Sequence, residues 1–397
     1  MSEHPQDERE PRGAPPGAAS AAGRRGGRTE TEARRANGNG PGPGRGIRNL
    51  VRAWLRGAPK VGQTPADVIH RENKWSLLRY RPRAEGLTYA TPILLVPSLI
   101  NRHYVLDLQP GRSFAGFLVE RGHDVYIIDW GSPGDEDRYL EFDDICDRYL
   151  GRAVRKVAAR SERRQVHLLG YCLGGTLATI YTAARPERVA SLTALAAPID
   201  FSDEGMLARW TRTDTFDLDA LVDACGNVPW ALMQASFQML RPTLQVAKFV
   251  GVVDRAWDDE FLDGFFALER WLNDNISFPG ECYRRYIREL YRENALMRGA
   301  FALSGNVVRL GAITCPTLVV SFEHDHIVPS PSAAPLVDCV SSPDTEHLRL
   351  AGGHVGAVIS RKAKERLWPT MAAWWEARDR VANAHDEAAP SAPPAPV

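Results

Sequence analysis

Residues 165–175 read QVHLLGYCLGG and place Cys172 between a run of apolar residues and a pair of glycines. The apolar run has the length and composition of a buried strand, and the residues after the glycines continue in a helical pattern. A strand that passes directly into a helix needs a sharp turn, and small residues two positions before and after it prevent a clash. Gly170 and Gly174 occupy those positions. The segment therefore predicts that Cys172 stands on a strained turn at the end of a strand.

A cysteine on such a turn is placed for nucleophilic chemistry. The turn lifts its sulfur to the N-terminus of the next helix, where the helix dipole stabilises a thiolate. The backbone N–H of Leu173 is predicted to donate to an oxyanion there, and a second donor is expected from Ser98 or Leu99. The other interpretation is a glycine-rich turn with a buried cysteine, which the flanking strand and helix disfavour. Cys172 is therefore the predicted nucleophile.

Short apolar runs alternate with amphipathic helical patterns on both sides of this turn. The buried strands are predicted at 92–97, 124–130, 165–171, 192–197, 317–322 and 346–350. A hairpin is predicted before them at 75–90, and helices are predicted at 113–122, 142–157 and 176–184. This alternation is typical of an α/β fold with a mostly parallel sheet covered on both faces.

The predicted nucleophile needs a base, because a free thiol with a pKa near ~8.5 is mostly protonated at neutral pH. In the α/β-hydrolase fold, which places its nucleophile on this kind of turn, an acid follows a late strand and a histidine follows the last. Asp325 follows the strand at 317–322. His354 follows the strand at 346–350, within the segment GGHVG. Cys172, Asp325 and His354 occur in the order of that fold and form the predicted triad.

Other polar residues compete for these roles. His324 and His326 flank Asp325, but adjacent loop residues point away from one another and neither histidine follows the last strand. Glu323 competes as the acid, although the sequence HIVP after Asp325 favours Asp325. Structural roles are expected for the histidines at 103, 123 and 167.

The composition argues against several classes of protein. Lys and Arg together number 49 and so do Asp and Glu, so no overall field attracts nucleic acid or an anionic membrane. No apolar run approaches the roughly 18 residues of a membrane span, and no secretion signal follows the two arginines at 24 and 25. The six cysteines form no C-x-x-C pair, so neither a zinc site nor a disulfide framework is predicted. We expect a cytoplasmic protein without a metal.

The chain divides into a core, an insertion and two polar ends. Residues 65–200 and 311–380 are predicted to form the catalytic core. Residues 201–310 are rich in aromatic side chains and are predicted to form a largely helical cap over the site. Residues 1–46 contain no Leu, Ile, Val or aromatic residue and are predicted to be disordered, like the tail at 381–397.

A short basic helix is predicted at 47–56. Its apolar side chains recur at helical spacing, at Ile47, Leu50, Val51, Trp54 and Leu55. Arginines occupy the other face, at Arg45, Arg48, Arg52 and Arg56. The helix either docks on the core or adheres to a hydrophobic or anionic surface, and the sequence leaves both alternatives open.

Several segments together resemble the poly(3-hydroxyalkanoate) synthases, namely GYCLGG at 170–175, DHIVP at 325–329, GGHVG at 352–356, LINRHY at 99–104, DWG at 129–131, GNVP at 226–229 and ERWLND at 269–274. The similarity covers about residues 65–380. The short length and the cap segments are most similar to the class III catalytic subunit, which works with a second subunit. Two features depart from the family pattern: the long N-terminal tail, and Asn275 where a serine would be expected.

The resemblance implies an acyltransferase that polymerises short-chain (R)-3-hydroxyacyl-CoA, releases coenzyme A and grows a polyester on its cysteine. It also implies association with polyester granules, a second synthase subunit, dimerisation, and no cofactor beyond the coenzyme A of the substrate. Cysteine suits this reaction, because a thioester exchanges with another thioester at little cost and passes its acyl group downhill to a hydroxyl. Asp325 would either orient His354 or activate the substrate hydroxyl.

Two other functions would share parts of this sequence pattern. A thioesterase or polyester depolymerase would have the same fold and triad, but serine at position 172 would have favoured it. A non-enzymatic granule-binding protein would use the basic helix and the apolar cap without needing a triad. The complete predicted triad argues against this second alternative.

Overall fold

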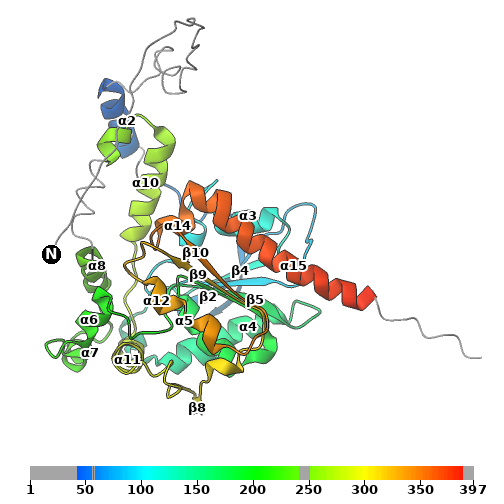
Figure 1. Ribbon diagram of the computed structural model, residues 1–397. Helices are drawn as coiled ribbons and strands as arrows, with labels where there is room; N and C mark the ends of the chain where they lie inside the picture. The colour runs from blue at the N-terminus through cyan, green and yellow to red at the C-terminus, as the bar shows by residue number, and fades with distance from the viewer. Residues whose placement is uncertain (1–42, 56, 58, 241–250, 388–397) are drawn as a thin grey trace, which may run out of the picture.

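The computed structural model describes residues 43–55, 57, 59–240 and 251–387, and within them it contains an eight-stranded sheet (Figure 1). The strands lie in the order β1-β2-β4-β3-β5-β6-β9-β10. Their bounds are β1 Ala66–Glu72, β2 Trp75–Tyr80, β3 Ile93–Val96, β4 Val125–Asp129, β5 Val166–Tyr171, β6 Val189–Leu195, β9 Thr317–Phe322 and β10 Thr345–Leu350. β2 pairs antiparallel with β1 and with β4, and every other neighbouring pair in this sheet is parallel. The predicted mostly parallel α/β sheet is confirmed.

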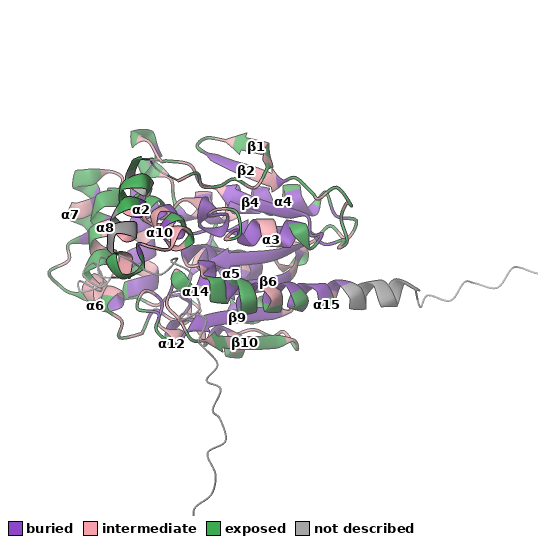
Figure 2. Cartoon of the chain, turned by 90° about the horizontal axis from the view of Figure 1, so that it is seen from above, coloured by how far each residue is buried: buried purple, intermediate pink, exposed green. Residues whose placement is uncertain are grey.

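Apolar side chains cover both faces of the sheet, because successive residues of a strand point to opposite sides. Leu168 of β5 packs on the face covered by α4 Gly151–Ala158 and α5 Leu173–Ala184, and Leu169 packs on the other face. That second face is covered by α3 Phe114–Glu120 and α15 Trp368–Glu387. Figure 2 shows the central strands buried between these layers.

Shorter elements connect the strands and helices of the core. They are η1 His103–Leu106, η2 Asp135–Tyr139, η3 Asp144–Leu150, η4 Pro186–Arg188, η6 Leu310–Ala312, α12 Ser330–Ala333, α13 Leu336–Cys339, α14 Gly356–Ile359 and η7 Ala363–Leu367. The hydroxyl of Ser113 caps α3 by accepting a hydrogen bond from the N–H of Gly116, so that helix begins where the sequence predicted it.

A largely helical insertion lies between β6 and β9. Its elements are α6 Met206–Arg212, α7 Leu218–Cys225, α8 Trp230–Met239, α10 Asp259–Leu272, α11 Gly280–Arg285, η5 Tyr286–Arg292, β7 Ala302–Leu303 and β8 Asn306–Val307. Figure 1 shows α6, α7 and α8 grouped at one end of the sheet, with α11 beside them. We call the insertion the cap.

The hairpin predicted at 75–90 is wrong in position. The hairpin is formed by β1 and β2, and its turn is at Asn73, whose φ of 49° lies in the left-handed region that asparagine tolerates. The strand predicted to open the hairpin, β2, is its second strand and pairs with β4 on its other side. β1 escaped prediction because it is an edge strand with few buried side chains, so its apolar periodicity is weak.

Each of the two segments predicted to be disordered overlaps a helix at the boundary nearest the core. The N-terminal helix, α2, spans Pro43–Leu55, so the boundary at residue 46 is wrong; residues 1–42 and Arg56 lie outside the described residues. α15 continues to Glu387, beyond the boundary at residue 381, because alanine and glutamate favour helix and the first proline after it is Pro390. Residues 388–397 are not described. No helix in the described part of the chain is long and apolar enough to cross a bilayer.

The helix α2 lies against α10 and is bonded through a polar residue to the turn that precedes α10. Asn49 is 4% exposed, and its side-chain amide donates to the carbonyl of Trp257. Val51 and Leu55, from the predicted apolar face, are 51% and 71% exposed. The side chains of Arg45, Ile47, Trp54 and Arg56 lie outside the described residues. Part of the apolar face of α2 therefore meets solvent rather than the core.

The helix α15 anchors the core through Trp375, which is fully buried against the sheet. Trp375→Ala is expected to lower the free energy of unfolding by about 3–5 kcal/mol, because the deleted ring leaves a cavity. Ala373 is exposed on the same helix, and Ala373→Ser is the matched control. Urea unfolding of both variants measures the difference, and equal stabilities would show that α15 does not contribute to the core.

Candidate active site

Cys172 stands on a strained turn between β5 and α5. Its φ of 56° and ψ of −131° are rare for a residue with a side chain, and its N–H donates to the carbonyl of Leu195 at 3.0 Å. A Cβ on Gly170 would fall inside contact distance of Gly174 and Gly175. The two elements can therefore meet only because these positions carry no side chain, as the sequence pattern predicted.

The first residues of α5 lie directly against the end of β3. A Cβ on Gly174 would collide with the carbonyl oxygens of Val96 and Pro97. Leu173 is the first residue of α5, so its N–H is among those that have no acceptor within the helix. Ser98 and Leu99 are buried in the loop after β3, and the Ser98 hydroxyl accepts from the N–H of Ile100. The assignment of oxyanion donors to Leu173 and to Ser98 or Leu99 remains a prediction.

His354 and Asp325 form a close buried pair. The Nδ1 atom of His354 lies 2.7 Å from Oδ2 of Asp325. The other carboxylate oxygen, Oδ1, accepts hydrogen bonds from the N–H groups of Ile327 and Val328, at 2.9 and 2.8 Å. Both oxygens of Asp325 are thus occupied, and its orientation is fixed by the backbone after β9.

The surroundings of His354 favour its protonated form. Burial alone would lower the pKa of this imidazole, but the charges of Asp325 and Cys172, and hydrogen bonds with both, raise it to about 10. Because Nδ1 faces Asp325, Nε2 is the ring atom left for the sulfur of Cys172. The structure therefore brings the three predicted residues into one chain of polar contacts.

The rival residues are placed elsewhere. Glu323, His324 and His326 are exposed, whereas Asp325 between them is buried. His103 pairs with Asp129 at 3.1 Å. The remaining two histidines, at 123 and 167, lie buried beneath α15 near its acidic residues. Among the described residues, no group of three or more His, Cys, Asp or Glu side chains is arranged to hold a metal ion.

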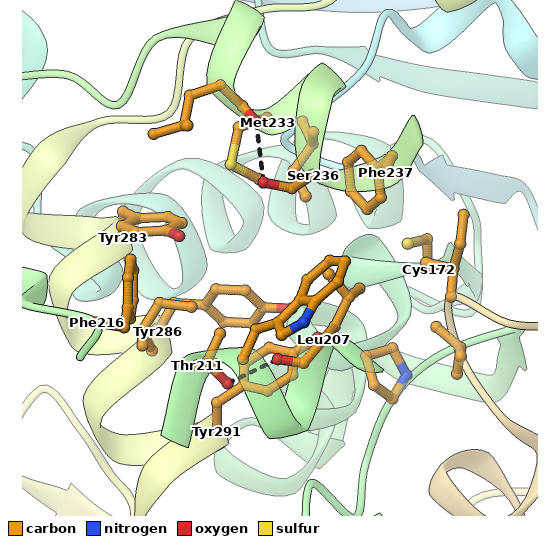
Figure 3. A pocket seen from close by; sticks show the side chains of 17 residues that line it. Cys172, Leu207, Thr211, Phe216, Met233, Ser236, Phe237, Tyr283, Tyr286 and Tyr291 are labelled. Carbon is orange, nitrogen blue, oxygen red and sulfur yellow. Dashed lines mark hydrogen bonds between the residues drawn. The ribbon is translucent and has the colours of Figure 1, made fainter. Parts of the chain in front are cut away.

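A cavity of about 270 Å³ opens onto Cys172 between the core and the cap (Figure 3). Its walls are mostly apolar and come from the loop after β3, α6, α8, α11, η5 and the segment after Asp325. α8 supplies four lining residues, Leu232, Met233, Ser236 and Phe237. An apolar wall of this kind lowers the polarity around the partly buried cysteine and strengthens charge interactions there.

Two phenols in this cavity were not predicted from the sequence. Tyr286 and Tyr291 line the cavity (Figure 3). Their rings meet edge to face at 5.3 Å. Burial, with the charge of Cys172, raises the pKa of both phenols, so they remain neutral. They are five residues apart, which on an α-helix separates side chains by about 140°. The segment η5 is a π-helix, and its i→i+5 hydrogen bonding brings them to one side.

The cap is tied to the loop after β3 by a group of hydrogen bonds. The indole N–H of Trp271 donates to the carbonyl of Arg102, and the Tyr104 hydroxyl donates to Asp274. Asn275, which departs from the family pattern, accepts from the amide of Asn101 and donates to Gln234 of α8. These bonds fix one side of the cavity.

Comparison with known proteins identifies the relatives of the chain. A model of the poly-beta-hydroxybutyrate polymerase (PhaC) N-terminus matches residues 56–118, and a model of the alpha/beta hydrolase fold matches residues 91–357. The chain is 39% identical over 323 residues to the poly(3-hydroxyalkanoate) polymerase subunit PhaC of Haloferax mediterranei, covering 81% of this chain and 65% of that protein. It is 35% identical to the same subunit of Allochromatium vinosum, covering 84% and 93%. Among solved structures, BpoC from Mycobacterium tuberculosis H37Rv shares the fold, with a TM-score of 0.50, 14% identity, and coverage of 79% and 99%.

The charge of Asp325 is expected to keep His354 protonated. Asp325→Asn removes that charge, so the pKa of His354 should fall below its value of about 10. A histidine NMR titration measures the shift, with His354→Gln to assign the signal. Glu323→Gln, which neutralises an exposed carboxylate two residues away, is the control and should leave the titration unchanged. An unaltered His354 titration in Asp325→Asn would contradict the electrostatic account.

Proposed function

The chain belongs to the family of poly(3-hydroxyalkanoate) polymerase PhaC subunits, and on that premise we propose that it polymerises (R)-3-hydroxyacyl-CoA through an acyl thioester on Cys172. The family and the fold support an enzyme of polyhydroxyalkanoate synthesis. The observation that carries the proposed mechanism is the position of Cys172 on a strained turn, in contact with the His354–Asp325 pair.

In the first step, the thiolate of Cys172 attacks the carbonyl of the acyl-CoA thioester. The new bond joins the Cys172 sulfur to the acyl carbon, and the bond to the coenzyme A sulfur breaks. The protonated His354 gives its proton to the leaving thiolate, so coenzyme A departs as a thiol. The N–H of Leu173 and one from Ser98 or Leu99 would hold the oxyanion formed between these events.

In the second step, the 3-hydroxyl of a hydroxyacyl unit attacks the acyl thioester. An oxygen–carbon bond forms, the carbon–sulfur bond to Cys172 breaks, and the hydroxyl proton passes to His354 while the Cys172 thiolate is restored. Asp325 orients His354 in this scheme. Its two oxygens already accept from His354, Ile327 and Val328, and its side chain is fully buried, which supports orientation rather than direct activation of the hydroxyl.

The cavity supports a substrate with a short acyl chain. Its volume of about 270 Å³ is suited to a small acyl unit and is too small for a growing polyester. The cap must therefore open as the chain lengthens. The helix α8 is the element that we propose to move, because Met233 is its only buried residue although four of its residues line the cavity.

The association with granules or a second subunit is assigned to α2. Val51 and Leu55 present an exposed apolar surface, and Arg48 and Arg52 are exposed beside them. Such a helix adheres to an apolar surface with anionic groups. The protein would thus remain beside its insoluble product in the cytoplasm. The second subunit and dimerisation are carried over from the resemblance alone.

The acylation step tests the nucleophile. Purified protein mixed with 3-hydroxybutyryl-CoA should release a burst of about one coenzyme A per chain, followed by turbidity from polymer. Cys172→Ala is expected to abolish both, because no other group can hold the acyl unit. Cys225→Ala, which removes an exposed cysteine of the cap, is the matched control and should retain both. A burst in Cys172→Ala, or free acid instead of polymer in the wild type, would contradict the proposal.

The exposed surface of α2 tests granule association. The double variant Val51→Asp and Leu55→Asp is expected to shift most of the protein from the granule fraction to the supernatant of fractionated cells, because charged groups resist burial. Val307→Asp places one such carboxylate on a cap valine as exposed as Val51 and is the control, and Val51→Asp alone is compared with it charge for charge. If the double variant sediments with granules like the control, α2 serves only to pack on α10.

A further inference from the structure

Tyr171, the residue before the predicted nucleophile, contacts His354 as well as the apolar core around it. Tyr171 is the last residue of β5 and is 2% exposed. Its side chain leaves the sheet on the face covered by α14 and α15, opposite the face covered by α5. It does not line the cavity at Cys172, so it has no contact with a substrate held there.

Tyr171 touches His354 in two ways. Its hydroxyl donates to the backbone carbonyl of His354 at 3.3 Å. Its ring also stacks on the imidazole, with 5.3 Å between centroids and an angle of 27° between planes. An aromatic face in this position attracts a protonated imidazole. One side chain therefore supports both the backbone and the ring of the same residue.

The loop that carries His354 needs such support. It contains glycines at positions 352, 353 and 356, and Gly352 has a φ of 140° that residues with side chains rarely adopt. His354 itself lies between β10 and α14, outside any helix or strand. Asp325 holds the Nδ1 atom of the ring but does not hold the backbone. The Tyr171 hydroxyl donates to the carbonyl of His354, and the N–H of His324 donates to the carbonyl of Gly352.

We propose that Tyr171 is a positioning residue for His354, so that the strand carrying Cys172 also sets the position of its base. This inference rests on the proposed role of His354. Because β5 ends at Tyr171 and the turn follows at once, any movement of the strand shifts the sulfur and the imidazole together. The hydroxyl is suited to the role, since burial and the charges of Cys172 and Asp325 raise the pKa of Tyr171 well above its usual value. It stays protonated and continues to donate.

Two variants separate the hydroxyl from the ring. Tyr171→Phe keeps the stacked ring and loses one hydrogen bond, and the expected loss in kcat for coenzyme A release is about threefold to tenfold. Tyr171→Leu loses both contacts, and a misplaced base makes a loss of about 100-fold reasonable. KM should stay within about twofold of wild type in both, because Tyr171 does not line the cavity. The pKa of His354 should fall further in Tyr171→Leu than in Tyr171→Phe.

Tyr80→Phe is the matched control, because Tyr80 is equally buried in the same apolar cluster and lies on β2, away from His354. It should change stability by a similar amount and leave kcat and the His354 titration unchanged. The proposal is overturned if folded Tyr171→Leu retains kcat within about twofold of wild type, or if Tyr80→Phe lowers kcat as much as Tyr171→Phe. Should Tyr171→Leu not fold, a wild-type kcat and titration in Tyr171→Phe overturn it.

His354→Gln is measured in parallel to keep two failures apart. If His354→Gln still releases coenzyme A at the wild-type rate, the proposed function itself is wrong. If it abolishes release while both Tyr171 variants behave like wild type, only the positioning role is wrong.

Discussion

The backbone of Cys172 is held at a positive φ, and much of the core is arranged to keep it there. Such a conformation costs about 1–3 kcal/mol for a residue with a side chain, and favourable packing around the turn must offset this cost. The N–H of Cys172 is held by Leu195 of β6, and α5 presses on β3 through Gly174. Three neighbouring strands therefore meet at one residue. The turn is therefore held by contacts with the centre of the sheet rather than by a loop.

The rest of the site combines a fixed charge arrangement with a less firmly held cover. Asp325 is locked by backbone N–H groups, and His354 is locked by Asp325, so the polar contacts belong to the core. The apolar walls belong mainly to the cap, where α8 has few buried residues of its own. The polar contacts around Cys172 thus lie on buried elements of the core, while the cavity wall over them includes a helix with a single buried residue.

The predictions from sequence succeeded where a local pattern has a single structural meaning. The glycines around Cys172 could serve only a tight turn, and the positions of Asp325 and His354 after late strands brought them together. The predictions failed where contacts between residues far apart in the sequence determine the secondary structure. β1 is exposed at a sheet edge, so its apolar periodicity is weak. The last turns of α15 consist of residues that favour helix, but the proline-rich tail directly after them made the whole segment look disordered. Tyr286 and Tyr291 lacked the spacing of one α-helical face, and only the wider turn of η5 makes them neighbours.

That wider turn gives the segment around Tyr286 an unusual kind of constraint. In most helices a substitution matters through the side chain that it changes, and the number of residues is set by the span to be covered. In η5 the pairing of Tyr286 with Tyr291 depends on the count of residues between them. Residues five apart lie about 140° apart on an α-helix, so an α-helical segment would pair the two tyrosines only if one of the four were removed and they stood four apart. The helix type and the number of residues in this segment are therefore coupled: with four residues between the tyrosines the wider π turn pairs them, and with three between them an ordinary α-helical turn would do so.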